Sequence, residues 1–402
     1  MSAPSIAPYY PFAGVLPVHQ TVEEHRDGAE AVITLAPEEG AWPACSGCGQ
    51  VSFLVHSYGS RRVRDLNLAH AQVWLNVPQR KVRCAHCGIR VEALDFVALH
   101  RRFTKRFESV VADLCRVLPL KHVASHFGLS WHTVKEIDRR RLEREVGTAC
   151  YDGLKVLAID EIAVRKGHEY MTIVLDLEHG RVVWVGHGRC EATLSDFFSE
   201  MSAEQRASIQ AIAVDMSPPF RKGIEIWCPH AAVVYDFFHV VAKYGREVID
   251  AIRNQQATRH TGPDRAFIKG SRYLLLRNQR DLKPEQWVEL KALLEVNEPL
   301  AIAYMLKDQL KEIWTYTREA WATRALLEWT ALAFDSGLPP LIRFAKGLLR
   351  HVDGVLNHCR HPIHTGRLEG FNNKVKVIKR QAYGFRDDEY FKLKIKAASQ
   401  PA

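Results

Sequence analysis

The 402-residue sequence lacks any apolar run near 18 residues, the length that a membrane-spanning helix requires. It also lacks the N-terminal pattern of a secretory signal, in which basic residues precede an apolar segment. We therefore expect no membrane association and a cytoplasmic location. The composition, with 47% apolar and 25% charged residues, is ordinary for a globular protein of several domains.

A disulfide framework is absent as well, because the nine cysteines form two C-x-x-C pairs and five isolated residues. Cys45 and Cys48 make the first pair, and Cys84 and Cys87 the second, each beside a glycine that permits a tight turn. Four thiolates spaced in this way predict one tetrahedral structural zinc site. A redox-active pair is the alternative, but no thioredoxin-like βαβ pattern surrounds either pair.

The net charge of +9 is concentrated in residues 60–146, which hold 18 Lys and Arg against 9 Asp and Glu. This predicts a polyanion such as nucleic acid as partner, with an ordinary solvated basic face as the alternative. Residues 41–98 are predicted to form a zinc-ribbon DNA-binding domain, and residues 1–40 a separate N-terminal segment with a strand near 31–35. The expected DNA contacts of the ribbon are Arg61, Arg62, Arg64, Arg80, Lys81 and Arg83.

Residues 99–150 are predicted to form a helix-turn-helix domain. After a helix over 101–118, Ala124, Gly128 and Val134 occur at the spacing of that motif, and Ser130 is suited to cap the second helix. A helical pair with a purely structural role is the alternative. In the DNA-binding interpretation the second helix presents four residues to the major groove, namely Trp131, His132, Lys135 and Arg139.

Two apolar strands are each predicted to end on an aspartate, at Asp160 and Asp215. A carboxylate at the tip of a core strand loses hydration unless a cation compensates it. The predicted order after residue 150 is three meandering strands, a helix, a strand, a helix and a strand, as in a ribonuclease-H-like α/β domain. In that fold the first and fourth strands are parallel neighbours. The alternatives are Asp160 as a strand-end cap and Asp215 as a helix cap. Four rival acids are Glu161, Asp176, Asp196 and Asp236, of which Asp236 is the strongest because it also follows a strand.

Helical periodicity runs almost unbroken from Lys243 to about His351, which predicts an all-helical insertion over 243–351. The α/β catalytic domain would then comprise 151–242 and 352–395. A last helix is predicted to begin near Thr365, with Glu369 at the head of a basic stripe suited to gripping phosphate. The predicted polar face of this helix holds Glu369, Asn372, Asn373, Lys376 and Arg380, and Lys374 and Lys379 are further expected phosphate contacts, with solvated lysines as the alternative.

These residues resemble the ISL-three group of bacterial insertion-sequence transposases over nearly the whole chain. The resemblance rests on the paired C-x-x-C motifs, the helix-turn-helix, A-I-D-E, V-D-M-S, D-F-F-H and E-G-F-N-N-K-V-K-V-I-K-R-Q-A-Y-G-F. It implies a DDE catalytic triad of Asp160, Asp215 and Glu369, with the helical insertion before the third acid. Asp236-x-x-His239 is similar to the D-x-x-H motif of related transposases, and both residues would support the metal ligands.

We expect, from this resemblance, a transposase that binds the terminal inverted repeats of its insertion sequence as a homodimer on double-stranded DNA, at the bacterial nucleoid. Asp160, Asp215 and Glu369 would hold two Mg²⁺ ions, with Mn²⁺ as a substitute, for strand cleavage and strand transfer. Two other functions stay open. One is a catalytically inactive, transposase-derived DNA-binding regulator, and the other is a structure-specific nuclease.

Overall fold

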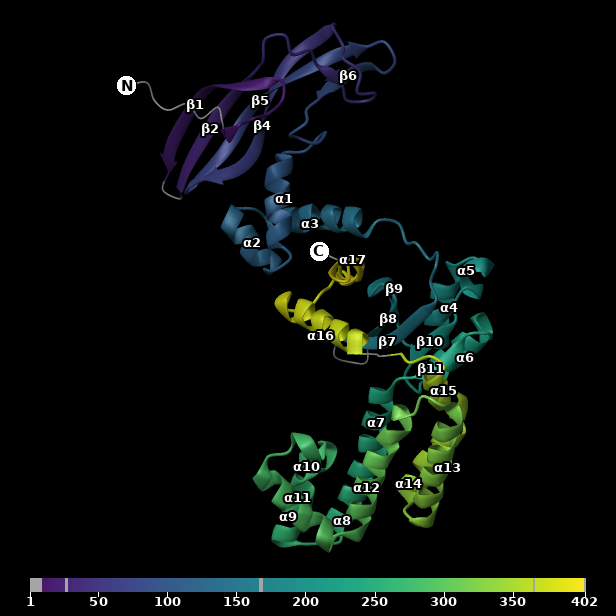
Figure 1. Cartoon of the computed structure of the whole chain (residues 1–402). Helices are drawn as coiled ribbons and strands as arrows, with labels where there is room; N and C mark the ends of the chain where they lie inside the picture. Colours follow the sequence, from purple (N-terminus) through teal and green to yellow (C-terminus); the bar gives the residue numbers. More distant parts are fainter. Residues whose placement is uncertain (1–8, 26–27, 166–168, 364–365, 401–402) are drawn as a thin grey trace. The chain divides into compact units, whose positions relative to one another are not determined.

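The computed structural model describes residues 9–25, 28–165, 169–363 and 366–400. The chain divides into two compact units, Met1–Arg144 and Glu145–Ala402 (Figure 1). Within the described ranges, no helix is both long and apolar enough to cross a membrane. The first unit contains β1 (Val15–His25), β2 (Gly28–Pro37), β3 (Ala44–Cys45), β4 (Val55–Leu68), β5 (Ala71–Cys84), β6 (Gly88–Ala93), α1 (Lys105–Leu114), α2 (Leu120–Phe127) and α3 (Trp131–Val146).

The strands of the first unit form one six-stranded sheet in the order β1, β2, β5, β6, β3, with β4 paired to β5. The expected strand near 31–35 is present as part of β2. However, residues before 40 do not form a separate segment, because β2 pairs in parallel with β5 and β1 pairs with β2. Alternate residues of these strands, among them Ile33, Val73 and Leu75, are buried in a common core.

The helices of the first unit follow the sheet and contain the expected helix pair. Thr104 caps α1 through its hydroxyl, which accepts a hydrogen bond from the N–H of Phe107 at 3.2 Å. Gly128 ends α2 with φ at +65°, a conformation that side chains disfavour. The hydroxyl of Ser130 then accepts from the N–H of Thr133 at 3.2 Å, at the start of α3. The first predicted helix is shorter than 101–118, because α1 begins only after this Thr104 cap.

The second unit contains a five-stranded sheet in the order β11, β10, β7, β8, β9, in which β7, β10 and β11 are parallel. The expected parallel pairing of the first and fourth strands is therefore present. The elements that build this sheet and its flanks are β7 (Val156–Arg165), β8 (Glu169–Asp176), β9 (Arg181–His187), α4 (Glu191–Ser199), α5 (Ala203–Ala207), β10 (Ala211–Val214), α6 (Pro218–Trp227), β11 (Ala232–Tyr235), α16 (Gly366–Gln381) and α17 (Asp388–Ala398).

β7 does not end at Asp160, which corrects the sequence prediction. Its parallel neighbour β10 pairs with it only as far as Ala158, but the antiparallel neighbour β8 pairs with it through Arg165. The strand therefore continues because β8 keeps supplying hydrogen bonds after β10 has stopped. Asp160 lies where one side of β7 is paired and the other is open.

Successive residues of the strands enter two different cores. Leu157 and Ile159 pack with α4 and α6 on one face, while Ala158 and Ile162 pack with α16 and α17 on the other. Figure 1 shows α16 beside the sheet of this unit. The start of this helix predicted near Thr365 lies outside the described residues, and the described helix begins at Gly366.

Between β11 and α16 the described residues are helical with short connections, as the predicted insertion requires. α7 continues through a π-helical turn, Gly245–Ile249, into α8. The helices are α7 (Phe237–Tyr244), α8 (Asp250–Thr258), α9 (Gly262–Gly270), α10 (Arg272–Leu276), α11 (Pro284–Val296), α12 (Glu298–Glu312), α13 (Glu319–Asp335), α14 (Pro339–Leu349) and α15 (Val352–Leu356).

Candidate active site

Three aspartates lie at the same edge of the sheet of the second unit. Asp215 directly follows β10, and Asp236 directly follows β11. Asp160 lies two residues beyond Ala158, the last residue of β7 that pairs with β10. Because β7, β10 and β11 run parallel, their carboxyl ends meet at one edge, as they do at the ligand sites of other α/β sheets. The sequence-predicted Asp160 and Asp215 are thus brought to neighbouring strands.

The alternation of the strands gives Asp160 and Asp215 the same face. Asp160 is two residues from Ala158 of β7, and Asp215 is two residues from Ala213 of β10, so each aspartate lies on the same face as that alanine. Both alanines belong to the core beneath α16. The two carboxylates are therefore directed to the face of the sheet that α16 covers, the helix that carries Glu369.

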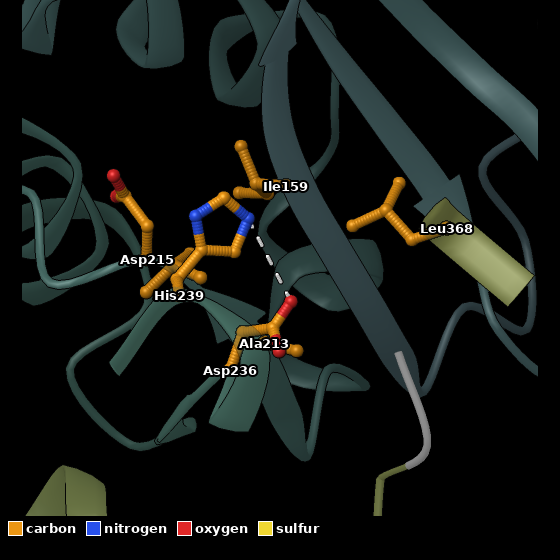
Figure 2. A pocket seen from close by; sticks show the side chains of 7 residues that line it. Ile159, Ala213, Asp215, Asp236, His239 and Leu368 are labelled. Carbon is orange, nitrogen blue, oxygen red and sulfur yellow. Dashed lines mark ion pairs between the residues drawn. The ribbon is translucent and has the colours of Figure 1, made fainter. Parts of the chain in front are cut away.

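His239 joins this acidic edge from the first turn of α7. Its Nε2 atom lies 3.8 Å from Asp160 Oδ1 and 3.8 Å from Asp236 Oδ2. Figure 2 shows the imidazole ring in a small pocket, with Asp215 and Asp236 also on its wall. Asp236 caps α7 as well, because its Oδ1 accepts from the N–H of Phe238 at 2.8 Å. The pocket is lined by Ile159, Ala213, Val214, Asp215, Asp236, His239 and Leu368.

The charges at this edge perturb one another. The nearby carboxylate of Asp160, together with the negative charges of Asp236 and Asp215, raises the pKa of His239 to about 9. Burial raises the pKa of Asp215, and the charges of Glu161 and Asp160 act in the same direction, while His239 opposes them. The edge is therefore an acidic cluster in which a protonated imidazole compensates part of the negative charge.

α16 packs beside this edge and carries both Glu369 and Asn372. Leu368 and Phe371 are buried against the sheet, and Leu368 lines the pocket. Glu369, in the first turn, is exposed. One turn later, Asn372 is only 7% exposed and donates from Nδ2 to Asp160 Oδ2 at 2.5 Å. The structure thus brings the helix of the third predicted acid against the first one through Asn372.

The donor set fits a divalent cation. Carboxylate oxygens are the ligands that Mg²⁺ and Mn²⁺ prefer, and burial of Asp215 disfavours its charged form unless a cation is near. Among the described residues, only the ligand atoms of Cys45, Cys48, Cys84 and Cys87 all lie within 4.8 Å of one another. The ligand atoms of Asp160, Asp215 and Glu369 are therefore spread more widely than this. Carboxylates repel one another, so an open arrangement of these acids is expected without a cation between them.

The basic residues of α16 divide into two kinds. Lys374 Nζ donates to the carbonyl oxygen of Ala398 at 2.6 Å, and Lys379 Nζ to that of Ala163 at 2.9 Å. These contacts tie the helix to α17 and β7. Lys376 is exposed and contacts Asn373 at 3.3 Å, and Arg380 is exposed. Lys376 and Arg380 are the better oriented of the four for an external phosphate.

In the first unit, the four predicted zinc ligands form a compact cluster. The sulfur atoms of Cys45, Cys48, Cys84 and Cys87 all lie within 4.8 Å of one another. Backbone N–H groups of Cys87 and His86 lower the pKa of the Cys84 thiol to about 6, which favours the thiolate that binds metal. None of the four cysteines forms a disulfide. The cluster fits a structural zinc ion.

Two of the predicted DNA contacts in the first unit are buried, which corrects the prediction. Arg64 is 1% exposed and donates to the carbonyl oxygen of Val73 at 3.1 Å. The backbone at 102–104 pairs with that of Arg64, and the guanidinium lies 5.4 Å from the centre of the Phe107 ring. Arg80 is 9% exposed and donates to Glu92 Oε2 at 2.8 Å. Both guanidinium groups therefore stabilise the sheet.

The remaining predicted DNA contacts keep some exposure. Lys81 and Arg83 are exposed on β5, Arg62 is exposed and paired with Glu30, and Arg61 is half-buried with a hydrogen bond to the carbonyl oxygen of Arg101. On α3, the exposed rings of Trp131 and His132 stack with centroids 3.8 Å apart. Lys135 and Arg139 are half-buried on the same helix, and Arg139 pairs with Glu143.

Sequence reasoning missed the contact between Asn372 and Asp160. Asn372 was placed on the polar face of the last helix without a role of its own. Its distance of three residues from Glu369 is the signal that was available, because residues at i and i+3 share a helix face. Only the packing of α16 on β7 shows that this position meets Asp160.

The ordered set of a cysteine cluster, a helix-turn-helix and an α/β domain with an acidic edge defines a DNA-binding transposase with a DDE catalytic domain. Three family models match in that order: a zinc-finger of transposase IS204/IS1001/IS1096/IS1165 at residues 42–87, a helix-turn-helix domain of transposase family ISL3 at 92–142, and a transposase domain at 157–395. The chain belongs to the ISL3 family of transposases.

Named relatives cover most of the chain. The protein is 44% identical over 357 residues to the transposase for insertion sequence element IS1001 of Bordetella parapertussis, which covers 88% of each chain. It is 28% identical over 388 residues to the transposase for insertion sequence element IS1557 of Mycobacterium tuberculosis, covering 90% of this chain and 87% of the relative. The DDE domain implies a divalent metal, and the helix-turn-helix implies DNA as partner.

Proposed function

We propose that this transposase binds the terminal inverted repeats of its insertion sequence as a dimer and catalyses Mg²⁺-dependent cleavage and strand transfer at the edge formed by Asp160, Asp215 and Glu369. The observation that carries the proposal is the pair Asp160 and Asp215, on one face of neighbouring parallel strands. The strand order supports a ribonuclease-H-like catalytic domain over 151–242 and 352–395, interrupted by the insertion 243–351. Residues 41–98 and 99–150 would recognise DNA.

In this reaction the protein's own groups orient the reactants. Asp160 is held by the N–H of Glu161 at 2.8 Å and by Asn372, so its carboxylate has a defined direction. Two Mg²⁺ ions held by the three acids would activate the attacking oxygen and stabilise the leaving one. Lys376 and Arg380 would grip phosphates beside Glu369. Water attacks first at the ends of the element, and the freed 3′-hydroxyl then attacks target DNA.

The test uses the full-length protein and a labelled DNA fragment that carries an end of its own element, with Mg²⁺ or EDTA. Asp160→Asn, Asp215→Asn and Glu369→Gln should each abolish cleavage while binding persists. Asp196→Asn is the matched control, because Asp196 is an exposed acid of α4, which packs on the opposite face of the sheet. Cleavage that survives in any triad variant, or that Asp196→Asn removes equally, contradicts this assignment.

Two other functions remain as outcomes of the same assay. Tight binding of the ends without cleavage, also with paired ends and Mn²⁺, would identify a DNA-binding regulator. Normal cleavage without joined products would identify a nuclease. A dimer is tested by the mass of the complex on DNA, since joining two ends to a target requires two active sites.

A further inference from the structure

Among the described residues, the side-chain amide of Asn372 makes one hydrogen bond, and its partner is an acid of the proposed triad. Its Nδ2 atom donates to Asp160 Oδ2 at 2.5 Å, across 212 residues of sequence. The other carboxylate oxygen of Asp160, Oδ1, accepts from the N–H of Glu161 and lies 3.8 Å from His239 Nε2. Each oxygen of Asp160 thus has its own donor. Without such donors the terminal torsion of an aspartate is broad, and its oxygens have no fixed direction.

The carbonyl oxygen of the Asn372 side chain lowers the stability of the fold. Its Oδ1 atom is buried and has no hydrogen-bond partner among the described residues. A buried acceptor left unpaired costs free energy, and an apolar side chain of similar size at that position would remove the cost. The packing of α16 does not need the amide either, because Leu368, Phe371 and Val375 already bury its apolar face. The one gain that the amide offers in the described structure is therefore its contact with Asp160.

We propose that Asn372 is a positioning residue, which fixes the direction of the Asp160 carboxylate and ties the helix of Glu369 to the strand of Asp160. The inference rests on the proposed function, because it deepens the role of the same site. Glu369 is one turn earlier on α16, so the register of this turn against β7 sets where its carboxylate is delivered. Small errors in such placement are expensive in rate, up to about 100-fold for a displacement of about 1 Å.

The test compares Asn372→Leu with Asn278→Leu in the full-length protein. Asn278 is a matched control, because its Nδ2 also donates to a carboxylate, that of Asp281 at 2.8 Å, but on the exposed surface of the insertion. Three quantities are measured: the unfolding temperature in EDTA, the Mn²⁺ concentration that gives half of the metal-induced shift in that temperature, and the rate of DNA end cleavage.

For Asn372→Leu we expect an unfolding temperature in EDTA close to that of the wild type, because loss of the donor to Asp160 offsets the gain from removing the unpaired Oδ1. We also expect at least a fivefold higher Mn²⁺ midpoint and a cleavage rate lower by roughly 10- to 100-fold. Asn278→Leu should leave the Mn²⁺ midpoint and the cleavage rate unchanged. Asn372→Asp gives a second test: two adjacent carboxylates should lower the unfolding temperature in EDTA, and Mn²⁺ should raise it by more than in the wild type.

The outcomes separate this inference from the proposed function. An Asn372→Leu protein that unfolds several degrees lower with an unchanged Mn²⁺ midpoint shows a structural amide, which overturns the positioning role. Wild-type cleavage and midpoint in that variant overturn it as well. If the wild type binds Mn²⁺ but cleaves no ends, the proposed function fails while a raised midpoint in Asn372→Leu still supports positioning. If the wild type neither binds Mn²⁺ nor cleaves DNA ends, the proposed function and the positioning role of Asn372 are both contradicted.

Discussion

Replacing His239 by asparagine should remove a pH dependence of stability that the acidic edge creates. The ordinary pKa of histidine is 6.5, and the carboxylate of Asp160 with those of Asp236 and Asp215 raises the pKa of His239 to about 9. Between these values the folded protein holds a proton that the unfolded chain has released. This contribution to stability is therefore complete below about pH 6.5 and is lost as the pH rises through about 9.

The size of the effect follows from the shift and from solvent exposure. Each pKa unit corresponds to about 1.4 kcal/mol, so the shift sets a ceiling of roughly 3 kcal/mol. The side chain of His239 is 42% exposed, and solvent screening of exposed charge pairs reduces the expected contribution to about 1 kcal/mol. In a unit of this size, that free energy corresponds to roughly 2–4 °C in unfolding temperature.

Thermal unfolding of the wild type and of His239→Asn in EDTA, from about pH 6 to about pH 10, measures this contribution. The gap in unfolding temperature between the two proteins should narrow as the pH rises through about 9. Added Mg²⁺ should flatten the pH dependence, because a cation near Asp160 opposes protonation of His239. A gap that is constant over the range, or that widens with pH, refutes the charge compensation described for this edge.

Three further changes test the fold around the sites. Cys84→Ser should release zinc from the purified protein, as metal analysis would show, and should lower the unfolding temperature of the first unit as a chelator does with the wild type. Gly354→Ala should destabilise the second unit by about 1–3 kcal/mol in denaturant unfolding, because the new Cβ would lie 2.3 Å from the ring of Tyr235. Gly347→Ala should instead stabilise the second unit by about 0.5–1 kcal/mol, because there is open space around its new Cβ. Arg64→Met should cost about 2–3 kcal/mol of unfolding free energy, since it leaves buried carbonyl groups unpaired, and should leave the salt dependence of DNA binding unchanged; a reduced salt slope at full stability would argue for a DNA contact instead.

The sheet of the second unit was predictable because its signals are local. Apolar runs that end in a carboxylate identify Asp160 and Asp215, and the order of strands and helices is enough to make their strands parallel neighbours. The continuation of β7 past Asp160 was not predictable, since it depends on β8 extending its pairing through Arg165. A strand end is set by its neighbours as well as by its own residues.

The buried arginines show a second limit of sequence reasoning. Arg62 and Arg64 are two residues apart on β4, so their side chains lie on the same face of the strand. In a two-stranded hairpin both would face solvent. In the structure the segment at 102–104 pairs with the backbone of Arg64, whose guanidinium lies against the ring of Phe107, while Arg62 stays exposed. Guanidinium groups bury well only where carbonyl oxygens are available, and those of Asp65 and Val73 are provided by strands. The number of charges along the chain does not predict which arginines find such carbonyl partners.

The charge balance around Asp160 explains how several acids can share one edge in the folded protein. Asp215 is buried enough for its pKa to rise, and Glu161 adds a further negative charge nearby. His239 offsets these charges, and Asn372 supplies an N–H donor without adding a charge of its own. A divalent cation held by the same carboxylates would lower the pKa of His239 and favour release of its proton. The Asn372 contact carries no charge, so the positioning role proposed for it would not depend on whether a proton or a cation compensates the acids.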